Sequence, residues 1–175
     1  MAVKRDSLLN AVFGFLVTVM ICSGQTAGTI TTVAGYVGGL GCAGDGGSAT
    51  SAQLNMPAGL AIDQTGNLYI ADTLCNCVRK VTPTGTISRV AGSGLVGFSG
   101  DGGSAPTAAL NGPSGVALSS SGELLISDSG NYRIRKVSTS GIISTIAGTG
   151  TTGIAADNLP ANQVRIDSPS AELIE

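Results

Sequence analysis

The chain has 175 residues, a net charge of -2 and 27 glycines, and only 3 % of its residues are aromatic. It contains no histidine, which excludes Ser/His/Asp or Cys/His nucleophile pairs and His-ligated zinc formed within this chain. Nine Lys and Arg against eleven Asp and Glu argue against a nucleic-acid partner, and 42 % hydrophobic residues are too many for a disordered chain.

The first 24 residues have the order of a secretory signal peptide. Lys4 and Arg5 precede an apolar run from Leu8 to Cys22, and small residues follow. We place the cleavage after Gly24, so the remaining chain, residues 25–175, is expected to be secreted and to have no membrane contact after cleavage. The alternative is an uncleaved anchor, although the run is shorter than the roughly 20 residues that span a membrane.

Most of the remaining chain repeats itself at a shift of 56 residues. Two full units, 57–92 and 113–148, each contain four short apolar runs separated by turn-forming residues, which is typical of short strands joined by tight turns. We place the strands at 58–63, 67–72, 77–82, 86–91, 114–119, 123–128, 133–138 and 142–147. Residues 28–35 match the last strand of a unit, and residues 169–175 match a first strand.

Each of the first two linkers contains a Gly-Asp-Gly-Gly motif with one carboxylate, Asp45 in the first and Asp101 in the second. We interpret the motif as a sharp turn in which the aspartate accepts hydrogen bonds from nearby amides. The alternative is a Ca²⁺ ligand, but one carboxylate per loop supplies too few oxygens for tight binding. We therefore expect no metal site and no cofactor.

A second pair of carboxylates, Asp72 and Asp128, ends the second strand of each unit. There we expect the side chains to bond amides two residues ahead. The alternative is that they line a rim that meets a ligand, together with the nearby basic pairs 79–80 and 135–136. Because neighbouring strand residues alternate faces, only one member of each basic pair can point to a given side, and we interpret these pairs as solvated strand edges.

Three cysteines lie beyond the expected leader, Cys42, Cys75 and Cys77. Disulfides persist in secreted proteins, so we expect one here. Cys75 and Cys77 are near the upper limit of separation for bridging each other, and Cys42, at the position of Phe98 in the next linker, is the favoured partner of one of them. The third thiol would be free or would bridge two chains.

The runs GLAIDQTGNLYIADT and GVALSSSGELLISDSGNYRIRKV, with the repeated I-[ST]-x-[VI]-A-G strand, resemble NHL repeats, the blades of six-bladed β-propellers. The resemblance covers roughly residues 28–175. It implies an all-β fold with four antiparallel strands in each blade. The family pattern Asp, Thr or Ser, Gly, Asn, a polar residue, Arg is kept from Asp128 through Asn131 to Arg133, whereas the first copy departs from it after Asp72.

The chain supplies about two and a half blades, whereas closed propellers need about four to eight. We expect a fragment or short relative of a longer propeller, or a protein completed by self-association or by a protein partner at its open blade edges. The expected function is that of a secreted, non-catalytic binding or scaffold module. Its candidate binding residues, in the rim loops, are Asp45, Asp101, Asp72, Asp128, Asn131 and Arg133. The alternatives are part of a metal-dependent lyase or hydrolase propeller, and an extracellular filament subunit.

Overall fold

The computed structural model describes residues 10–13, 16–19, 30–36, 38–153 and 158–170. The expected cleavage site after Gly24 and residues 171–175 of the expected final strand lie outside these ranges. Strands β1 (Asn10–Phe13) and β2 (Leu16–Val19) pair in a two-stranded antiparallel sheet. In the described ranges, no helix is long and apolar enough to cross a membrane.

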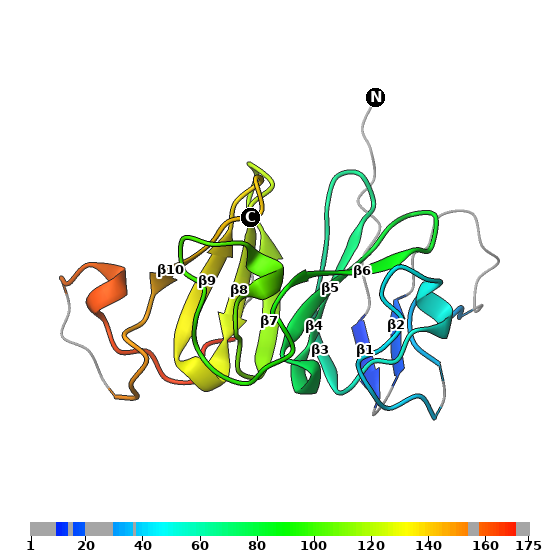
Figure 1. Cartoon of the computed structure of the whole chain (residues 1–175), viewed down its shortest axis with the longest axis horizontal. Helices are drawn as coiled ribbons and strands as arrows, with labels where there is room; N and C mark the ends of the chain where they lie inside the picture. Colours follow the sequence, from blue (N-terminus) through cyan, green and yellow to red (C-terminus); the bar gives the residue numbers. More distant parts are fainter. Residues whose placement is uncertain (1–9, 14–15, 20–29, 37, 154–157, 171–175) are drawn as a thin grey trace.

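Two four-stranded antiparallel sheets form the body of the molecule (Figure 1). Blade one contains β3 (Pro57–Ile62), β4 (Leu68–Asp72), β5 (Cys77–Val81) and β6 (Ile87–Ala91) in sequential order. Blade two contains β7 (Pro113–Leu118), β8 (Leu124–Asp128), β9 (Arg133–Val137) and β10 (Ile143–Ala147), also in sequential order. The predicted all-β fold of four-stranded antiparallel blades is confirmed.

Short 3-10 helices occur at equivalent places in each repeat. Turns η2 (Thr73–Cys75) and η4 (Ser129–Asn131) join the second strand of a blade to the third. In the linkers lie η1 (Ala49–Ser51), η3 (Ala105–Thr107) and η5 (Ala161–Gln163). We call residues 36–56, 92–112 and 148–168 linkers one, two and three.

Residues 30–35, expected as the last strand of a preceding blade, are not a strand in this structure. A β-strand needs a neighbour to pair its backbone groups, and none of the described strands pairs with this segment. Its apolar end is nonetheless packed, since Ala34 is fully buried and the Gly35 N–H donates to Ala49 O at 2.9 Å. The equivalent bonds from Gly92 to Ala105 and from Gly148 to Ala161 attach the other two linkers in the same way.

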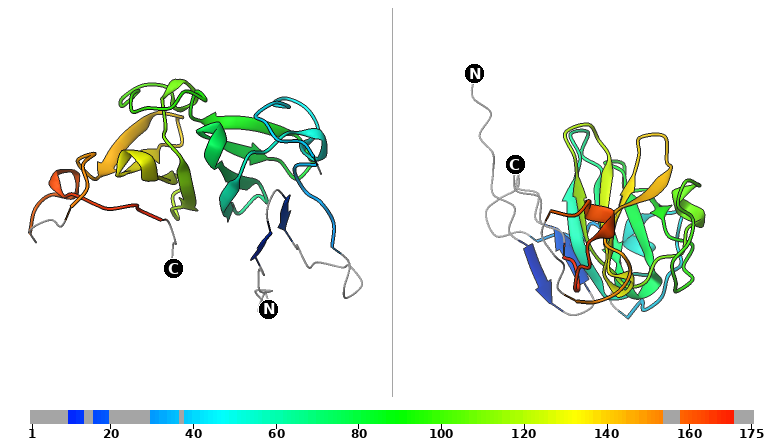
Figure 2. Two further views of the ribbon diagram at one scale, coloured as in Figure 1. Left: turned by 90° about the horizontal axis from the view of Figure 1, so that it is seen from below. Right: turned by 90° about the vertical axis from the view of Figure 1, so that its left-hand side faces the viewer.

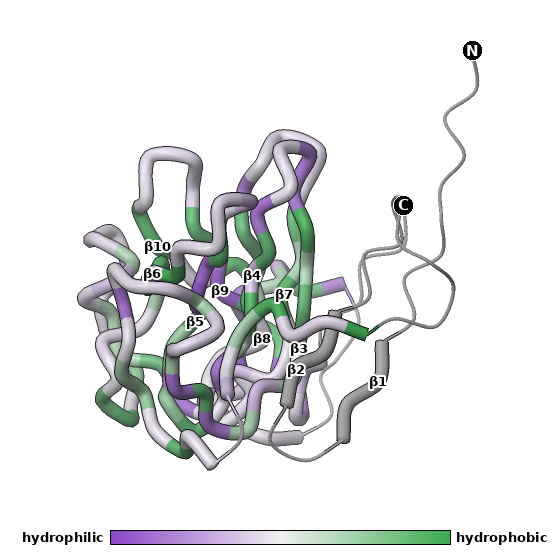
Figure 3. Tube along the Cα trace, turned by 90° about the vertical axis from the view of Figure 1, so that its right-hand side faces the viewer, coloured by the Kyte–Doolittle hydropathy of each residue, from purple (hydrophilic) through white to green (hydrophobic). Residues whose placement is uncertain are grey.

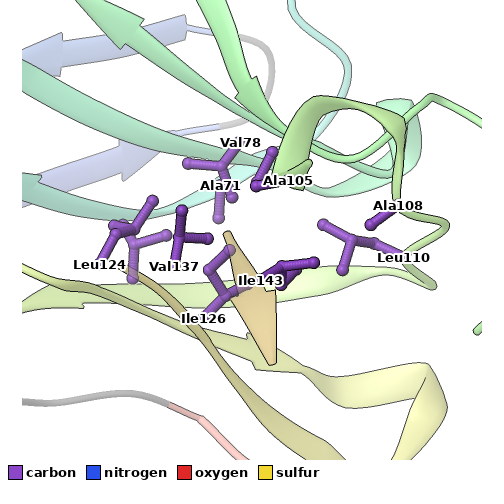
Figure 4. Close-up of a cluster of buried hydrophobic side chains, with 11 residues drawn as sticks. Ala71, Val78, Ala105, Ala108, Leu110, Leu124, Ile126, Val137 and Ile143 are labelled. Carbon is purple, nitrogen blue, oxygen red and sulfur yellow. The ribbon is translucent and has the colours of Figure 1, made fainter. Parts of the chain in front are cut away.

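The core lies between the two blades and beneath linker two (Figure 4). Blade one contributes small residues such as Ala71 and Val78, and blade two contributes larger ones such as Ile126 and Ile143. Linker two adds Leu110, which is fully buried. Each large aliphatic side chain stabilises the fold by roughly 1.5–3 kcal/mol, so this interface holds the blades together.

The innermost strands of the two blades, β3 and β7, approach closely at a pair of glycines. A Cβ atom placed on Gly59 would lie 2.9 Å from Ser114 O, and it would also collide with the Gly115 backbone. Only glycine allows this approach, so the stacking of the blades depends on it. In Figure 3 the strands carry many of the hydrophobic residues, and several of the loops beyond them are neutral or hydrophilic.

Linker one repeats the packing of linker two against the other side of blade one. Ala49, Ala52 and Leu54 bury themselves against a second cluster that includes Ile70 and Ile87. The described residues of linker three, 148–153 and 158–168, lie on the side of blade two that faces away from blade one (Figures 1 and 2). The three linkers are therefore arranged alike, and each packs beside a sheet.

Candidate functional site

Two fully buried arginines, Arg79 on β5 and Arg135 on β9, organise the end of each blade nearest the carboxylates that the sequence singled out. The expectation that the basic pairs are solvated is wrong for both. The register explains their burial, because Arg79 pairs with Ile70 and Arg135 with Ile126, on the faces that hold the aliphatic core residues. Only Lys80 and Lys136, on the opposite faces, keep partial exposure.

Each buried arginine bridges two aspartates. Arg135 Nη2 lies 2.7 Å from Asp101 Oδ1, and its Nη1 lies 3.2 Å from Asp128 Oδ2. In blade one, Arg79 Nη2 lies 2.9 Å from Asp45 Oδ1, and Nη1 lies 3.5 Å from Asp72 Oδ2. The linker aspartate and the strand-end aspartate of each repeat are thus joined through one guanidinium group.

The two linker aspartates accept bonds from arginines as well as taking part in turns. Asp45 also contacts a second arginine, with its Oδ2 3.5 Å from Arg89 Nε. Burial works against the charge of Asp101, but donors that include Arg135 lower the pKa of this carboxyl. Within the described ranges, no three Asp, Glu, Cys or His side chains are grouped as a metal ion requires. These ion pairs, which were not predicted from the sequence, supply counter-charges to the buried arginines.

The two strand-end aspartates are fully buried and bond the linker rather than amides two residues ahead. Asp72 Oδ1 accepts the Asn55 N–H at 2.7 Å, and Asp128 Oδ1 accepts the Asn111 N–H at 2.8 Å. Burial raises the pKa of Asp72 to about 6, against the opposing effects of the Asn55 amide and Arg79. Burial also raises the pKa of Asp128.

Cys42 and Cys75 form a disulfide with a Cα–Cα distance of 5.5 Å, which confirms the expectation that Cys42 bridges one of the other two. It joins linker one to η2. Cys77 is a free, fully buried thiol, and burial raises its pKa to about 12.

The second repeat makes the same connection without a covalent bond. Asn131, at the position of Cys75, donates from Nδ2 to Gly97 O at 2.7 Å and to Asp128 Oδ2 at 2.8 Å. Arg133, at the position of Cys77, stacks over Phe98 with its Cζ 3.7 Å from the ring centroid. Disulfide and polar network therefore occupy equivalent places and fix the linker to the turn in each repeat.

The structure thus brings the predicted residues together in two networks. Asp45 and Asp72 lie around Arg79, Asp101, Asp128 and Asn131 lie around Arg135, and Arg133 stacks on Phe98. Their role toward a ligand stays a prediction. Arg79 and Arg135, which centre both networks, are the residues that sequence reasoning missed. Strand alternation carried the signal, because it places each of them on the face of a buried isoleucine.

A family model described as the Teneurin NHL domain matches residues 39–97 and 96–173 of this chain. Human Teneurin-4 is 42 % identical over 100 residues, which are 50 % of this chain and 4 % of that protein. Mouse Teneurin-1 is 37 % identical over 92 residues, or 45 % of this chain and 3 % of the relative. The chain therefore spans only a small part of the length of these relatives.

One solved structure, a structural-genomics protein of unknown function from Bacteroides thetaiotaomicron, superposes with a TM-score of 0.66 at 20 % identity. The match covers 89 % of this chain and 36 % of that one. At this identity the likeness is one of fold.

Proposed function

Because the chain belongs to the Teneurin NHL domain family, we propose that it serves as an extracellular, non-catalytic β-propeller scaffold that associates through an exposed blade face, with a second copy of the chain as partner. The disulfide between Cys42 and Cys75 supports an oxidising, extracellular location. The leader-like order of residues 1–24 supports it independently.

The observation that carries the proposal is the exposure of linker three. Ala105, Ala108 and Leu110 of linker two are all fully buried between the blades. Their equivalents in linker three, 56 residues later, are Ala161, which is exposed, and Val164 and Ile166, which are half-buried. The equivalence has a geometric basis, because a Cβ atom on Gly148 would lie 3.0 Å from Ile166 Cδ1, as one on Gly92 would from Leu110 Cδ1.

We call this surface, formed by Ala161, Val164, Ile166 and the adjoining side of blade two, the distal face. It has the linker half of the interface that joins blade one to blade two, and no described strand covers it as the aliphatic residues of blade two cover linker two. Burying an apolar surface of this kind drives association. A second copy offers the same residues, and a two-fold arrangement of like faces makes a closed dimer.

Sedimentation velocity on the purified protein over a range of concentrations tests the proposal. We expect the average mass to rise above that of one chain as concentration increases. Ile166→Asp should hold the protein at the mass of one chain, because a carboxylate buried in an apolar interface costs several kcal/mol. Leu74→Asp is the matched control, since Leu74 is 53 % exposed on blade one, and it should leave association unchanged.

Two results would contradict the proposal. One is a protein that keeps the mass of one chain at every concentration. The other is an equal loss of association in the Leu74→Asp and Ile166→Asp variants, which would mean that apolar exposure in general, rather than the distal face, drives the contact.

A further inference from the structure

A cleft of about 510 Å³ opens between the two blades, on the other side of blade two from the distal face. Blade one lines it with Tyr69 and Lys80, linker two with Ser104 and Pro106, and blade two with Leu124 and Thr139 among others. Its volume lies in the range of small-molecule sites, and it combines apolar walls with a few polar groups, as such sites do.

Lys80 gives the cleft a cation that has no carboxylate partner among the described residues. In blade two the equivalent Lys136 is paired, with its Nζ 2.8 Å from Glu123 Oε1. Asn67 stands at the position of Glu123 in blade one, and its amide donates to Asp63 Oδ2 at 2.7 Å. In the part of the chain that the structure describes, no carboxylate lies within ion-pair distance of Lys80. Lys80 is half-buried as a residue, and its ammonium group is therefore available to an anion from outside the chain.

Tyr69 adds a half-buried ring with a hydroxyl group on the blade one wall, where blade two has Leu125. The hydroxyl contacts Asp63 Oδ2 only at 3.4 Å, and it remains able to accept a further hydrogen bond. Thr139 and Ser104 are exposed and bring two more hydroxyl groups. Pro106 and Leu124 supply apolar surface between these groups.

This combination fits one class of ligand better than a simple anion or an apolar molecule. A sugar ring presents C–H groups that pack on aliphatic and aromatic surface, and hydroxyl groups that bond other hydroxyls. A carboxylate on the ring would meet the Lys80 ammonium group. We propose that the cleft between the blades binds an acidic saccharide, with a uronate carboxylate on Lys80 and the sugar ring against Tyr69, Pro106 and Leu124.

Isothermal titration calorimetry with an unsulfated disaccharide that contains glucuronate tests the inference, with the carboxyl-reduced neutral disaccharide as comparison. We expect the acidic sugar to bind at least about tenfold more tightly, the difference expected for one hydrogen bond to a charged group. Lys80→Gln should reduce its affinity by a similar factor. The matched control Lys136→Gln, which removes the paired lysine of blade two, should leave the affinity unchanged.

A second variant separates the charge from the fold. Asn67→Glu places beside Lys80 the partner that Lys136 has, and it should weaken binding although Lys80 is present. Thermal melting of each variant reports whether the blades remain intact. The inference is overturned if the acidic and neutral sugars bind alike or not at all, or if Lys136→Gln weakens binding as much as Lys80→Gln. It is also overturned if inorganic sulfate competes as strongly as the disaccharide, because a lone anion site would then suffice.

Discussion

A buried guanidinium group between two carboxylates is the smallest repeated unit of this molecule. The Arg135 side chain is fully buried, and Asp101 and Asp128 are its counter-ions. Removing the arginine would leave the buried Asp128 carboxylate without its counter-ion and near the Asp101 carboxylate. Such a loss of one partner is costly because the remaining charge stays buried.

We therefore predict that Arg135→Met lowers the free energy of unfolding by about 3–5 kcal/mol. Lys136→Met, one residue along the strand, breaks an exposed pair with Glu123 and should cost far less stability than Arg135→Met. Urea unfolding of the two variants measures the difference. Equal losses in both would show that the arginine network contributes no more than a surface ion pair.

Asp63 stabilises the first turn of blade one by accepting bonds from Thr65 and Asn67. Burial opposes its charge, yet these bonds lower the pKa of Asp63 to about 2. A pKa below that of the unfolded chain means that the contribution is present above about pH 4 and is lost as pH falls toward the folded-state pKa.

We predict that Asp63→Asn destabilises the protein by about 1 kcal/mol near pH 6, and that the difference from wild type shrinks near pH 3. Urea unfolding at both pH values checks this. Ser119→Ala changes the equivalent turn of blade two, where the Glu123 N–H bonds a hydroxyl group, and its effect should not vary with pH in this way. A constant difference for Asp63→Asn across pH would contradict the charge-based account.

At the scale of elements, the eight strands of the blades could be predicted from the sequence, because alternation and turn residues act locally. Their observed bounds differ from the predicted ones by no more than one residue at each end. The contacts of Asp72 and Asp128 could not be predicted in this way, since their partners lie 17 residues away in the linkers. The strand expected at 28–35 depended on a neighbour that the repeat pattern cannot supply.

The disulfide joins Cys42 of linker one to Cys75 of η2, which are 33 residues apart in the sequence. A loop of this length corresponds to about 3–4 kcal/mol of stabilisation in the chain-entropy account. We predict a loss of about that size in the Cys42→Ser/Cys75→Ser variant. Cys42→Phe/Cys75→Asn, which introduces the residues of the second repeat, should lose less because the introduced asparagine can donate to Gly41 O as Asn131 does to Gly97 O. Guanidinium unfolding ranks the variants, and equal stability of the wild type and the serine variant would refute the prediction.

The glycine contact between β3 and β7 offers a test of blade stacking. Gly59→Ala would place a methyl group against the backbone of Ser114 and Gly115, and backbone cannot move aside as a flexible side chain can. We predict a loss of at least about 1–3 kcal/mol, the usual cost of overpacking. Ala58→Ser, at an exposed neighbouring position, should change stability little. Thermal melting of both proteins compares them, and an unaffected Gly59→Ala variant would mean that the blades do not meet at this point.

At the scale of the whole molecule, two blades stack through linker two while linker three is only partly covered. The repeat of 56 residues could predict that stacking, because equivalent positions imply equivalent interfaces. It could not predict the ion pairs of the linker aspartates and the strand-end aspartates, because these depend on arginines that the strand register turns inward. Association through the distal face would complete at linker three the burial seen at linker two.

Hydrogen–deuterium exchange, read by mass spectrometry at low and high protein concentration, tests this central claim most directly. We predict that amides of residues 158–170 and of β9 and β10 gain protection at high concentration, because association covers the distal face. The turns 63–67 and 82–86 of blade one should not change. Protection gained in those turns, with none in residues 158–170, would contradict the account.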